Sequence, residues 1–145
     1  MPDCVAVAAD HGGFELKSLL LPELAALGLT VLDLGTDDRA PVDYPDFADA
    51  VAAAIATGRA DLGVLICGTG IGMSIAANRH AAVRAALCHD GLTARLARQH
   101  NDANVLVLGG RLIGPETAKD CLRIFFSTHF EGGRHSRRVA KLSRV

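Results

Sequence analysis

Residues 62–72 read Leu-Gly-Val-Leu-Ile-Cys-Gly-Thr-Gly-Ile-Gly, a nearly continuous apolar run that ends in a glycine-rich turn. An apolar run of this length is typical of a strand that is covered on both faces of a parallel sheet. Residues 71–80, which follow the turn, have the length of a short helix. The strand, turn and helix together predict an α/β fold.

The same alternation continues on both sides of this unit. We expect strands at residues 4–9, 30–34, 62–67, 84–88 and 105–109, and helices at residues 14–27, 45–57, 71–80, 92–100 and 115–127. Strands that alternate with helices in this way form βαβ units. The sequence therefore predicts a three-layer Rossmann-like fold, with a five-stranded parallel sheet and helices on both faces.

Length and composition restrict the kind of partner. The chain has 145 residues, of which 50% are hydrophobic, and its formal net charge is −1. This length fits one domain, and the charge argues against a polyanion or an anionic membrane surface as the main partner. One tyrosine and no tryptophan are available to stack on bases, and no apolar run approaches the roughly 20 residues that cross a bilayer. We expect a small-molecule ligand, with no nucleic acid and no membrane.

The cysteines and the first residues indicate the cellular compartment. Cys4, Cys67, Cys88 and Cys121 show no paired short spacing, and the start of the chain lacks the basic and apolar regions of a signal peptide. These features predict reduced thiols in the cytoplasm. No His-x-x-x-His or Cys-x-x-Cys spacing occurs, so the sequence predicts no metal site.

The C-terminal end differs in composition from the rest of the chain. Residues 132–145 follow Glu131 and contain two glycines, no acidic residue and five basic ones, namely Arg134, Arg137, Arg138, Lys141 and Arg144. We expect residues 1–131 to form the α/β domain and residues 132–145 to form a basic helical arm of the same domain. Arg134 and Arg138 are four residues apart, so one helix face would present both guanidinium groups to a phosphate. A solvated basic tail is the alternative that this spacing leaves open.

Three segments carry residues suited to chemistry. They are residues 10–13 (Asp-His-Gly-Gly), residues 67–72 (Cys-Gly-Thr-Gly-Ile-Gly) and residues 99–102 (Gln-His-Asn-Asp). Open α/β sheets bind ligands outside the carboxyl ends of their strands. We expect all three segments to meet at one edge of the sheet.

The glycine-rich turn resembles a phosphate-binding or dinucleotide-binding loop. A dinucleotide fingerprint that starts at Gly68 needs a glycine where Met73 stands, and one that starts at Gly70 needs a glycine where Ile75 stands. No Gly-Lys-Ser/Thr follows, which excludes a nucleoside triphosphate loop. A noncatalytic nucleotide-binding module and a purely structural turn remain alternatives.

Cys67 stands in front of these glycines, at the expected end of its strand. A thiol that faces a helix N-terminus tends toward the nucleophilic thiolate, and neighbouring backbone N–H groups stabilise an oxyanion. A buried, inert cysteine is the alternative, and it is the state that we expect for Cys4, Cys88 and Cys121. His11 and His100 are flanked by small or polar residues beside strands, where a histidine can transfer protons. A base, an oxyanion-stabilising turn, a histidine and an arginine pair predict enediol chemistry on a sugar phosphate.

Five segments carry a resemblance to a known family. They are residues 9–14 (Ala-Asp-His-Gly-Gly-Phe), 43–45 (Asp-Tyr-Pro), 67–78 (Cys-Gly-Thr-Gly-Ile-Gly-Met-Ser-Ile-Ala-Ala-Asn), 98–105 (Arg-Gln-His-Asn-Asp-Ala-Asn-Val) and 131–135 (Glu-Gly-Gly-Arg-His). The set closely resembles the type B ribose-5-phosphate isomerases, and the match runs nearly end to end. That family also holds galactose-6-phosphate isomerase subunits and some allose-phosphate and tetrose-phosphate isomerases.

The resemblance implies an aldose–ketose isomerase that needs no metal or other cofactor. It implies that ribose 5-phosphate and ribulose 5-phosphate interconvert through a cis-enediol, with Cys67 as the base that moves a proton between C1 and C2. Thr69 would shuttle a proton, His100 would open the furanose ring and Asp10 would hold sugar hydroxyls. Some relatives use a glutamate a few residues beyond this cysteine, but residues 71–74 here contain no acid.

The resemblance also implies a substrate-binding set and an assembly. The binding residues would be Asp10, His11, Tyr44, Gly68, Thr69, Gly70, Ile71, Gly72, Asn101, Arg111, Arg134 and Arg138. Among them, residues 68–72 would stabilise the enediolate, and His11 and the three arginines would surround the phosphate. We expect a homodimer, or a homotetramer, whose active sites take residues from both subunits. Allose 6-phosphate, galactose 6-phosphate and a tetrose phosphate are the alternative substrates.

Overall fold

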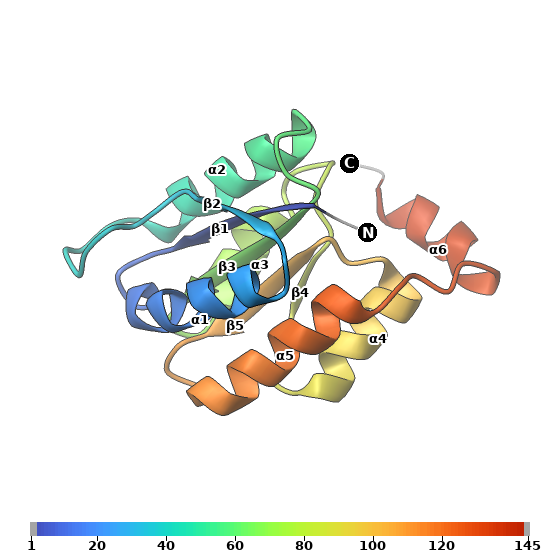
Figure 1. Cartoon of the computed structure of the whole chain (residues 1–145). Helices are drawn as coiled ribbons and strands as arrows, with labels where there is room; N and C mark the ends of the chain where they lie inside the picture. The colour runs from blue at the N-terminus through green and yellow to red at the C-terminus, as the bar shows by residue number, and fades with distance from the viewer. Residues whose placement is uncertain (1–2, 144–145) are drawn as a thin grey trace.

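The computed structural model describes residues 3–143, which form a single parallel sheet flanked by helices (Figure 1). The strands are β1 (Cys4–Ala9), β2 (Thr30–Asp33), β3 (Leu62–Cys67), β4 (Ala85–Leu87) and β5 (Val105–Gly109). The helices are α1 (Phe14–Ala26), α2 (Tyr44–Ala56), α3 (Ile71–Ala77), α4 (Gly91–Asn101), α5 (Pro115–Ser127) and α6 (Arg134–Leu142). The strand order is β2-β1-β3-β5-β4, and each neighbouring pair is parallel. Within residues 3–143 no helix has the length and apolar character needed to span a bilayer.

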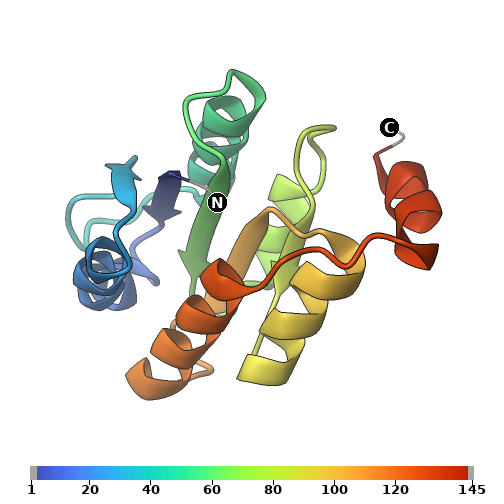
Figure 2. The same ribbon diagram turned by 45° about the vertical axis from the view of Figure 1, so that its right-hand side comes forward.

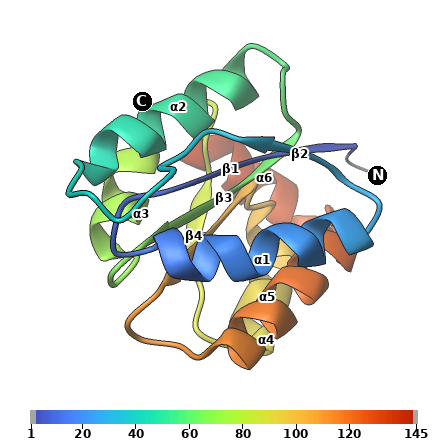
Figure 3. The same ribbon diagram turned by 60° about the vertical axis from the view of Figure 1, so that its left-hand side comes forward.

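The sheet is the middle of three layers, as the sequence predicted. Helices α1, α4 and α5 cover one face, and α2 and α3 cover the other (Figures 2 and 3). Alternate residues of β1 serve the two cores, because Val5 and Val7 pack under the first group of helices whereas Ala6 and Ala8 pack under the second. All six residues of β3 are buried, which explains its nearly continuous apolar sequence.

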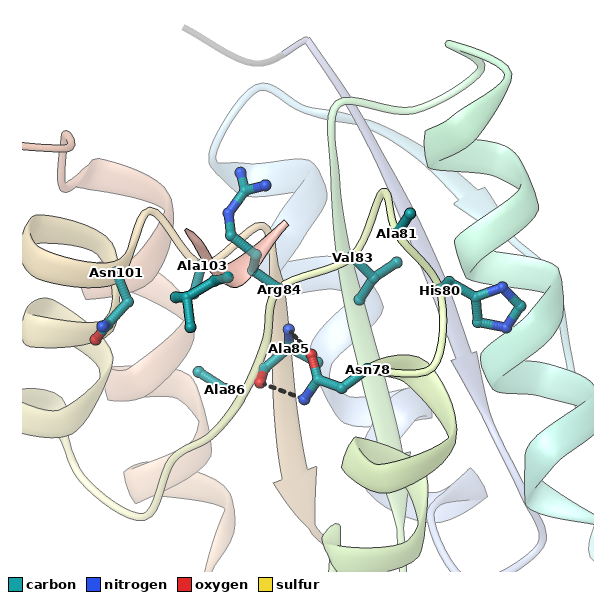
Figure 4. A pocket seen from close by; sticks show the side chains of 10 residues that line it. Asn78, His80, Ala81, Val83, Arg84, Ala85, Ala86, Asn101 and Ala103 are labelled. Atoms are coloured by element: carbon teal, nitrogen blue, oxygen red, sulfur yellow. Dashed lines mark hydrogen bonds between the residues drawn. The ribbon is translucent and has the colours of Figure 1, made fainter. Parts of the chain in front are cut away.

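The largest difference from the expected boundaries lies between α3 and β4. Helix α3 ends at Ala77, three residues before its predicted end, and β4 is limited to Ala85–Leu87. The Asn78 amide explains both ends, since its nitrogen donates to the Ala85 carbonyl at 2.9 Å and its oxygen accepts from the Ala85 N–H at 2.8 Å. The Asn78 side chain therefore binds both the N–H and the carbonyl of Ala85, the first residue of the edge strand β4, as Figure 4 shows.

The basic arm forms a helix of its own. Helix α6 lies beside α4, away from the sheet, and buries none of its side chains (Figure 2). Arg134 and Arg138 are both exposed and lie four residues apart on it, as the sequence predicted. Arg144, which was counted in the basic arm, lies outside the described residues.

Candidate active site

One cavity of about 400 Å³ opens at the carboxyl ends of the central strands. It is lined by Asp10, His11, Gly12, Tyr44, Cys67, Gly68, Thr69, Ile71, Gly72 and Arg111. These residues come from the loop after β1, the start of α2, the turn between β3 and α3, and the loop after β5. The fold thus places ten neighbouring residues where open α/β sheets bind ligands.

The turn after β3 holds one backbone N–H group against a cysteine. Cys67 is 5% exposed, and its Sγ accepts a hydrogen bond from the Gly70 N–H at 3.1 Å. Gly70 has a φ of 78°, and a Cβ at this position would lie 2.5 Å from Leu87 Cδ1. Only glycine fits this left-handed, tightly packed position. The turn therefore holds one backbone donor against the sulfur in a fixed position.

Asp10 and His11 form the wall that faces this turn. Asp10 is 7% exposed, and its carboxylate accepts from the Gly13 N–H at 3.1 Å. A Cβ on Gly12 would lie 3.1 Å from the Gly68 nitrogen, so the two loops touch at their glycines. The His11 Nδ1 accepts from the Val42 N–H at 3.2 Å, which leaves Nε2 as the donor of the neutral ring.

Arg111 and Tyr44 complete the rim of the cavity. The Arg111 N–H donates to the Gly68 carbonyl at 2.8 Å, and its guanidinium lies over Gly68, where a Cβ would be 3.4 Å from Nε. The Tyr44 ring packs on Gly72, where a Cβ would lie 2.5 Å from Cζ. The rim therefore combines one exposed cation with an aromatic hydroxyl, both held against the glycine-rich turn.

Four of the expected site residues lie elsewhere in the chain. His100 and Asn101 are at the end of α4, and Arg134 and Arg138 are on α6 beside it. Helix α4 runs from the carboxyl edge of the parallel sheet back to the edge where β5 begins, and so it carries its last residues away from Cys67. The prediction that residues 99–102 meet the other two segments at one sheet edge is therefore wrong within a single chain.

A second cavity, of about 350 Å³, lies at this opposite edge (Figure 4). Asn101 lines it together with Asn78, Val83, Arg84, Ala103 and Leu142. The polar groups of Asn78 are used by the Ala85 backbone, and Arg84 binds the carbonyl and carboxylate of Asp102. The lining contains no cysteine or carboxylate, so we place the candidate chemistry in the cavity around Cys67.

The end of α4 is fixed by a network of charged groups. Asp102 has a φ of 45°, and its carboxylate pairs with Arg84 at 3.3 Å and with Arg98 at 3.0 Å. Arg98 also donates to the Ala103 carbonyl. These bonds hold the helix end that presents His100 and Asn101.

The His100 ring has two neighbours that the sequence analysis did not identify. Its Nε2 lies 3.4 Å from Glu131 Oε1, and its ring stacks on the His135 ring with centroids 4.4 Å apart. The pKa of His135 is lowered, first by desolvation and then by the positive charges of His100 and Arg134. The sequence shows that Glu131 and His135 are four residues apart, which could have indicated that they lie close together. Their contact with His100 depends on tertiary structure and could not be predicted from this spacing.

None of the remaining cysteines lines this cavity. Burial raises the pKa of Cys88 and of Cys121 to about 11 in each case, so both remain protonated thiols at neutral pH. Cys4 is partly buried at the start of β1. The structure thus supports the expectation of an inert thiol for Cys88 and for Cys121.

Comparison with known proteins gives a consistent result over nearly the whole chain. The family model for Ribose/Galactose Isomerase matches residues 5–142. Ribose-5-phosphate isomerase B of Escherichia coli is 45% identical over 97% of this chain and 95% of its own length. D-erythrulose-4-phosphate isomerase of Pectobacterium atrosepticum is 43% identical over 95% of this chain and 91% of its own length. The crystal structure of a ribose 5-phosphate isomerase from Thermotoga maritima superimposes with a TM-score of 0.95, at 52% identity and 99% coverage of both chains.

Proposed function

The chain belongs to the ribose/galactose isomerase family of sugar phosphate isomerases, and we propose that its reaction is the interconversion of ribose 5-phosphate and ribulose 5-phosphate through a cis-enediol. One observation carries the mechanism. The Cys67 sulfur accepts the Gly70 N–H inside a cavity that also presents the buried Asp10 carboxylate. A base, a set of fixed donors and a hydroxyl-binding acid are thereby placed around one small volume.

The proposed reaction moves one proton between two carbons. The Cys67 thiolate removes the proton from C2 of the open-chain aldose, and the electron pair of that bond forms the C1–C2 double bond of an enediolate. The charge that develops on O1 is stabilised by the backbone N–H groups of Gly68, Thr69 and Gly72, since the Gly70 N–H binds Cys67 Sγ and the Ile71 N–H binds Thr69 Oγ1. Thr69 passes a proton from O2 to O1, and the Cys67 thiol returns its proton to C1. The ketose is then complete, and no metal or other cofactor takes part.

The walls of the cavity suit the rest of the substrate. Asp10 accepts hydrogen bonds from sugar hydroxyls, and Tyr44 borders the same space at the rim. His11 and Arg111 carry the donors that a phosphate requires, and both are exposed residues in the lining of the cavity. We assign the phosphate to these two residues.

We propose that a second copy of the chain completes the site. One chain leaves His100, Asn101, Arg134 and Arg138 at the edge of the sheet opposite to Cys67. Ile71 and Ile75 lie four residues apart on α3, beside the cavity, and are 53% and 61% exposed. Large apolar side chains exposed together in this way are typical of a protein interface. In a homodimer joined near this face, His100 of one copy would open the sugar ring bound beside Cys67 of the other.

Mixing two inactive variants tests the shared site. In the proposed dimer each site takes Cys67 from one copy and His100 from the other. Cys67→Ser removes the base, and His100→Asn removes the ring-opening group. After random exchange of equal amounts, half of the dimers are mixed and each carries one intact site, so about a quarter of wild-type activity returns. If the mixture stays as inactive as its components, Cys67 and His100 of the same chain serve the same site. This result rejects the shared site.

A panel of phosphorylated aldoses tests the substrate. We expect the highest kcat/KM with ribose 5-phosphate, measured by coupled detection of the ketose. The relative that acts on D-erythrulose 4-phosphate makes a four-carbon sugar phosphate the specific alternative, followed by allose 6-phosphate and galactose 6-phosphate. A thermal shift with nucleotides and no turnover of any sugar phosphate would instead favour the noncatalytic binding module.

A further inference from the structure

The cluster of His100, Glu131 and His135 has the composition of a metal site. These side chains come from the end of α4, from the linker after α5 and from the first turn of α6. One nitrogen or oxygen of each lies within 4.8 Å of those of the other two. In a single chain all three are partly open to solvent, so an ion can reach them without rearrangement of the core.

The distances are close to those around a tetrahedral zinc ion. Zinc lies about 2.0–2.2 Å from nitrogen and oxygen ligands, which places two tetrahedral ligands about 3.4 Å from each other. His100 Nε2 and Glu131 Oε1 are already 3.4 Å apart. The widest gap in the cluster must close by at most about 1.4 Å to reach this spacing. The His135 ring is stacked on the His100 ring, so one of the two rings must also turn for both nitrogens to point at a single ion.

The chemistry of the ligands selects the class of ion. Two imidazoles and one carboxylate suit zinc and neighbouring transition metals, whereas magnesium and calcium prefer oxygen ligands alone. Three protein ligands also leave a coordination position open to solvent. Glu131 supplies the negative charge of the cluster. This charge is needed because Arg134, next to His135, repels an incoming dication.

We propose that His100, Glu131 and His135 bind a transition-metal dication of the zinc class, and that the bound ion inhibits the enzyme by occupying the His100 imidazole. The second half of this statement rests on the proposed ring-opening role of His100. A ring nitrogen that coordinates a metal can neither donate nor accept the proton that ring opening requires. The ion therefore acts as an inhibitor, and the proton transfer at Cys67 proceeds without it.

Calorimetric titration with Zn²⁺ tests the site itself. The Cys67→Ser variant is the parent protein, because it removes the thiol that lines the substrate cavity while keeping the cluster. We expect one Zn²⁺ per chain, and we expect Glu131→Gln and His135→Gln to weaken this binding by at least about tenfold. His89→Gln is the matched control, since His89 is exposed and outside the cluster, and it leaves the affinity unchanged. Absence of Zn²⁺ binding in the parent, or equal affinity in parent and His135→Gln, overturns the proposal.

Activity measurements separate this site from the proposed reaction. With Cys67 present, Zn²⁺ should slow the isomerisation of ribose 5-phosphate and have little effect on a four-carbon aldose phosphate, which needs no furanose opening. The His135→Gln variant should lose this sensitivity to Zn²⁺. Inhibition that persists in His135→Gln acts elsewhere in the protein and overturns the proposal. If Zn²⁺ binds, and Glu131→Gln and His135→Gln weaken the binding as expected, but Zn²⁺ does not inhibit the enzyme, the metal site stands. The proposed inhibition and the proposed role of His100 in ring opening are then contradicted.

Discussion

Replacing Gly70 with alanine tests whether the turn after β3 is built as the structure indicates. At a φ of 78° an alanine is in the left-handed region, which costs roughly 1–2 kcal/mol. The new Cβ would also lie 2.5 Å from Leu87 Cδ1 and 3.1 Å from the Leu108 carbonyl carbon, and overpacking of this kind costs about 1–3 kcal/mol. We therefore expect Gly70→Ala to lower the free energy of unfolding by about 2–5 kcal/mol.

Gly58→Ala is the matched control for this measurement. Gly58 has a φ of 76°, but nothing lies within 4 Å of its missing Cβ, so this variant should lose only about 1–2 kcal/mol. Urea unfolding of the wild type and both variants gives the loss in free energy of unfolding for each variant. Because both variants pay for the left-handed backbone, the difference between their losses is the cost of the steric clash at Gly70. Movement of the Gly70 N–H away from Cys67 Sγ should also lower kcat by roughly ten- to a hundredfold, the worth of a hydrogen bond to a charged group. Equal losses of stability in the two variants, with full activity in Gly70→Ala, would refute the tight turn and its donor to the sulfur.

Three other outcomes follow from the site. Isomerase activity should survive exhaustive treatment with EDTA, because backbone N–H groups stabilise the enediolate; loss of turnover that one divalent metal restores would contradict this. Arg134→Ala and Arg138→Ala should each raise KM by a factor that corresponds to about 1.5–3 kcal/mol of phosphate binding, whereas Arg137→Ala, about 100° from Arg138 around the helix, should matter less. Equal losses at Arg137 and Arg138 in steady-state kinetics would argue against the helical clamp. Cys88 and Cys121 have pKa values raised to about 11, so mass spectrometry of the native protein after iodoacetamide treatment at pH 8 should find both unmodified; rapid alkylation of either would show that it is neither buried nor protonated.

Local pattern was sufficient to predict the sheet and one wall of the cavity. The apolar run of β3 and the glycines after it predicted a buried parallel strand, a turn and Cys67 at the strand end, all of which the structure shows. The loop after β1 was placed correctly by the same rule, because it follows a strand of the same sheet. Strong short-range signals of this kind survive tertiary packing.

The error at His100 has a geometric cause. Residues just before a strand of a parallel sheet lie at its amino edge, and residues 99–102 precede β5, so they face away from the loops that follow β1 and β3. The contact between His100 and His135 was beyond prediction from spacing along the chain. It requires the linker to turn back at Gly132 and Gly133, which have φ values of 68° and 55°.

Buried Lys17 is a second feature that local pattern concealed. A lysine in the first helix is ordinarily expected in solvent, yet this one is 1% exposed. Its ammonium group donates to the Asp33 carboxylate at 2.7 Å and to the Thr36 carbonyl at 2.8 Å. These bonds tie α1 to the end of β2, and they depend on a loop that sequence periodicity does not describe.

Exchange of the C2 proton with solvent deuterium tests the central claim most directly, because with a four-carbon aldose phosphate it reports carbon deprotonation apart from ring opening. In D₂O the wild-type enzyme should exchange this proton in a five-carbon and in a four-carbon aldose phosphate. Cys67→Ser should slow the exchange by about 10²–10⁴-fold with both substrates, since a serine hydroxyl is far less acidic than a thiol. His100→Asn should slow it only with the five-carbon substrate, which must open its ring first. Exchange by Cys67→Ser at close to the wild-type rate would show that another residue is the base and would contradict the mechanism.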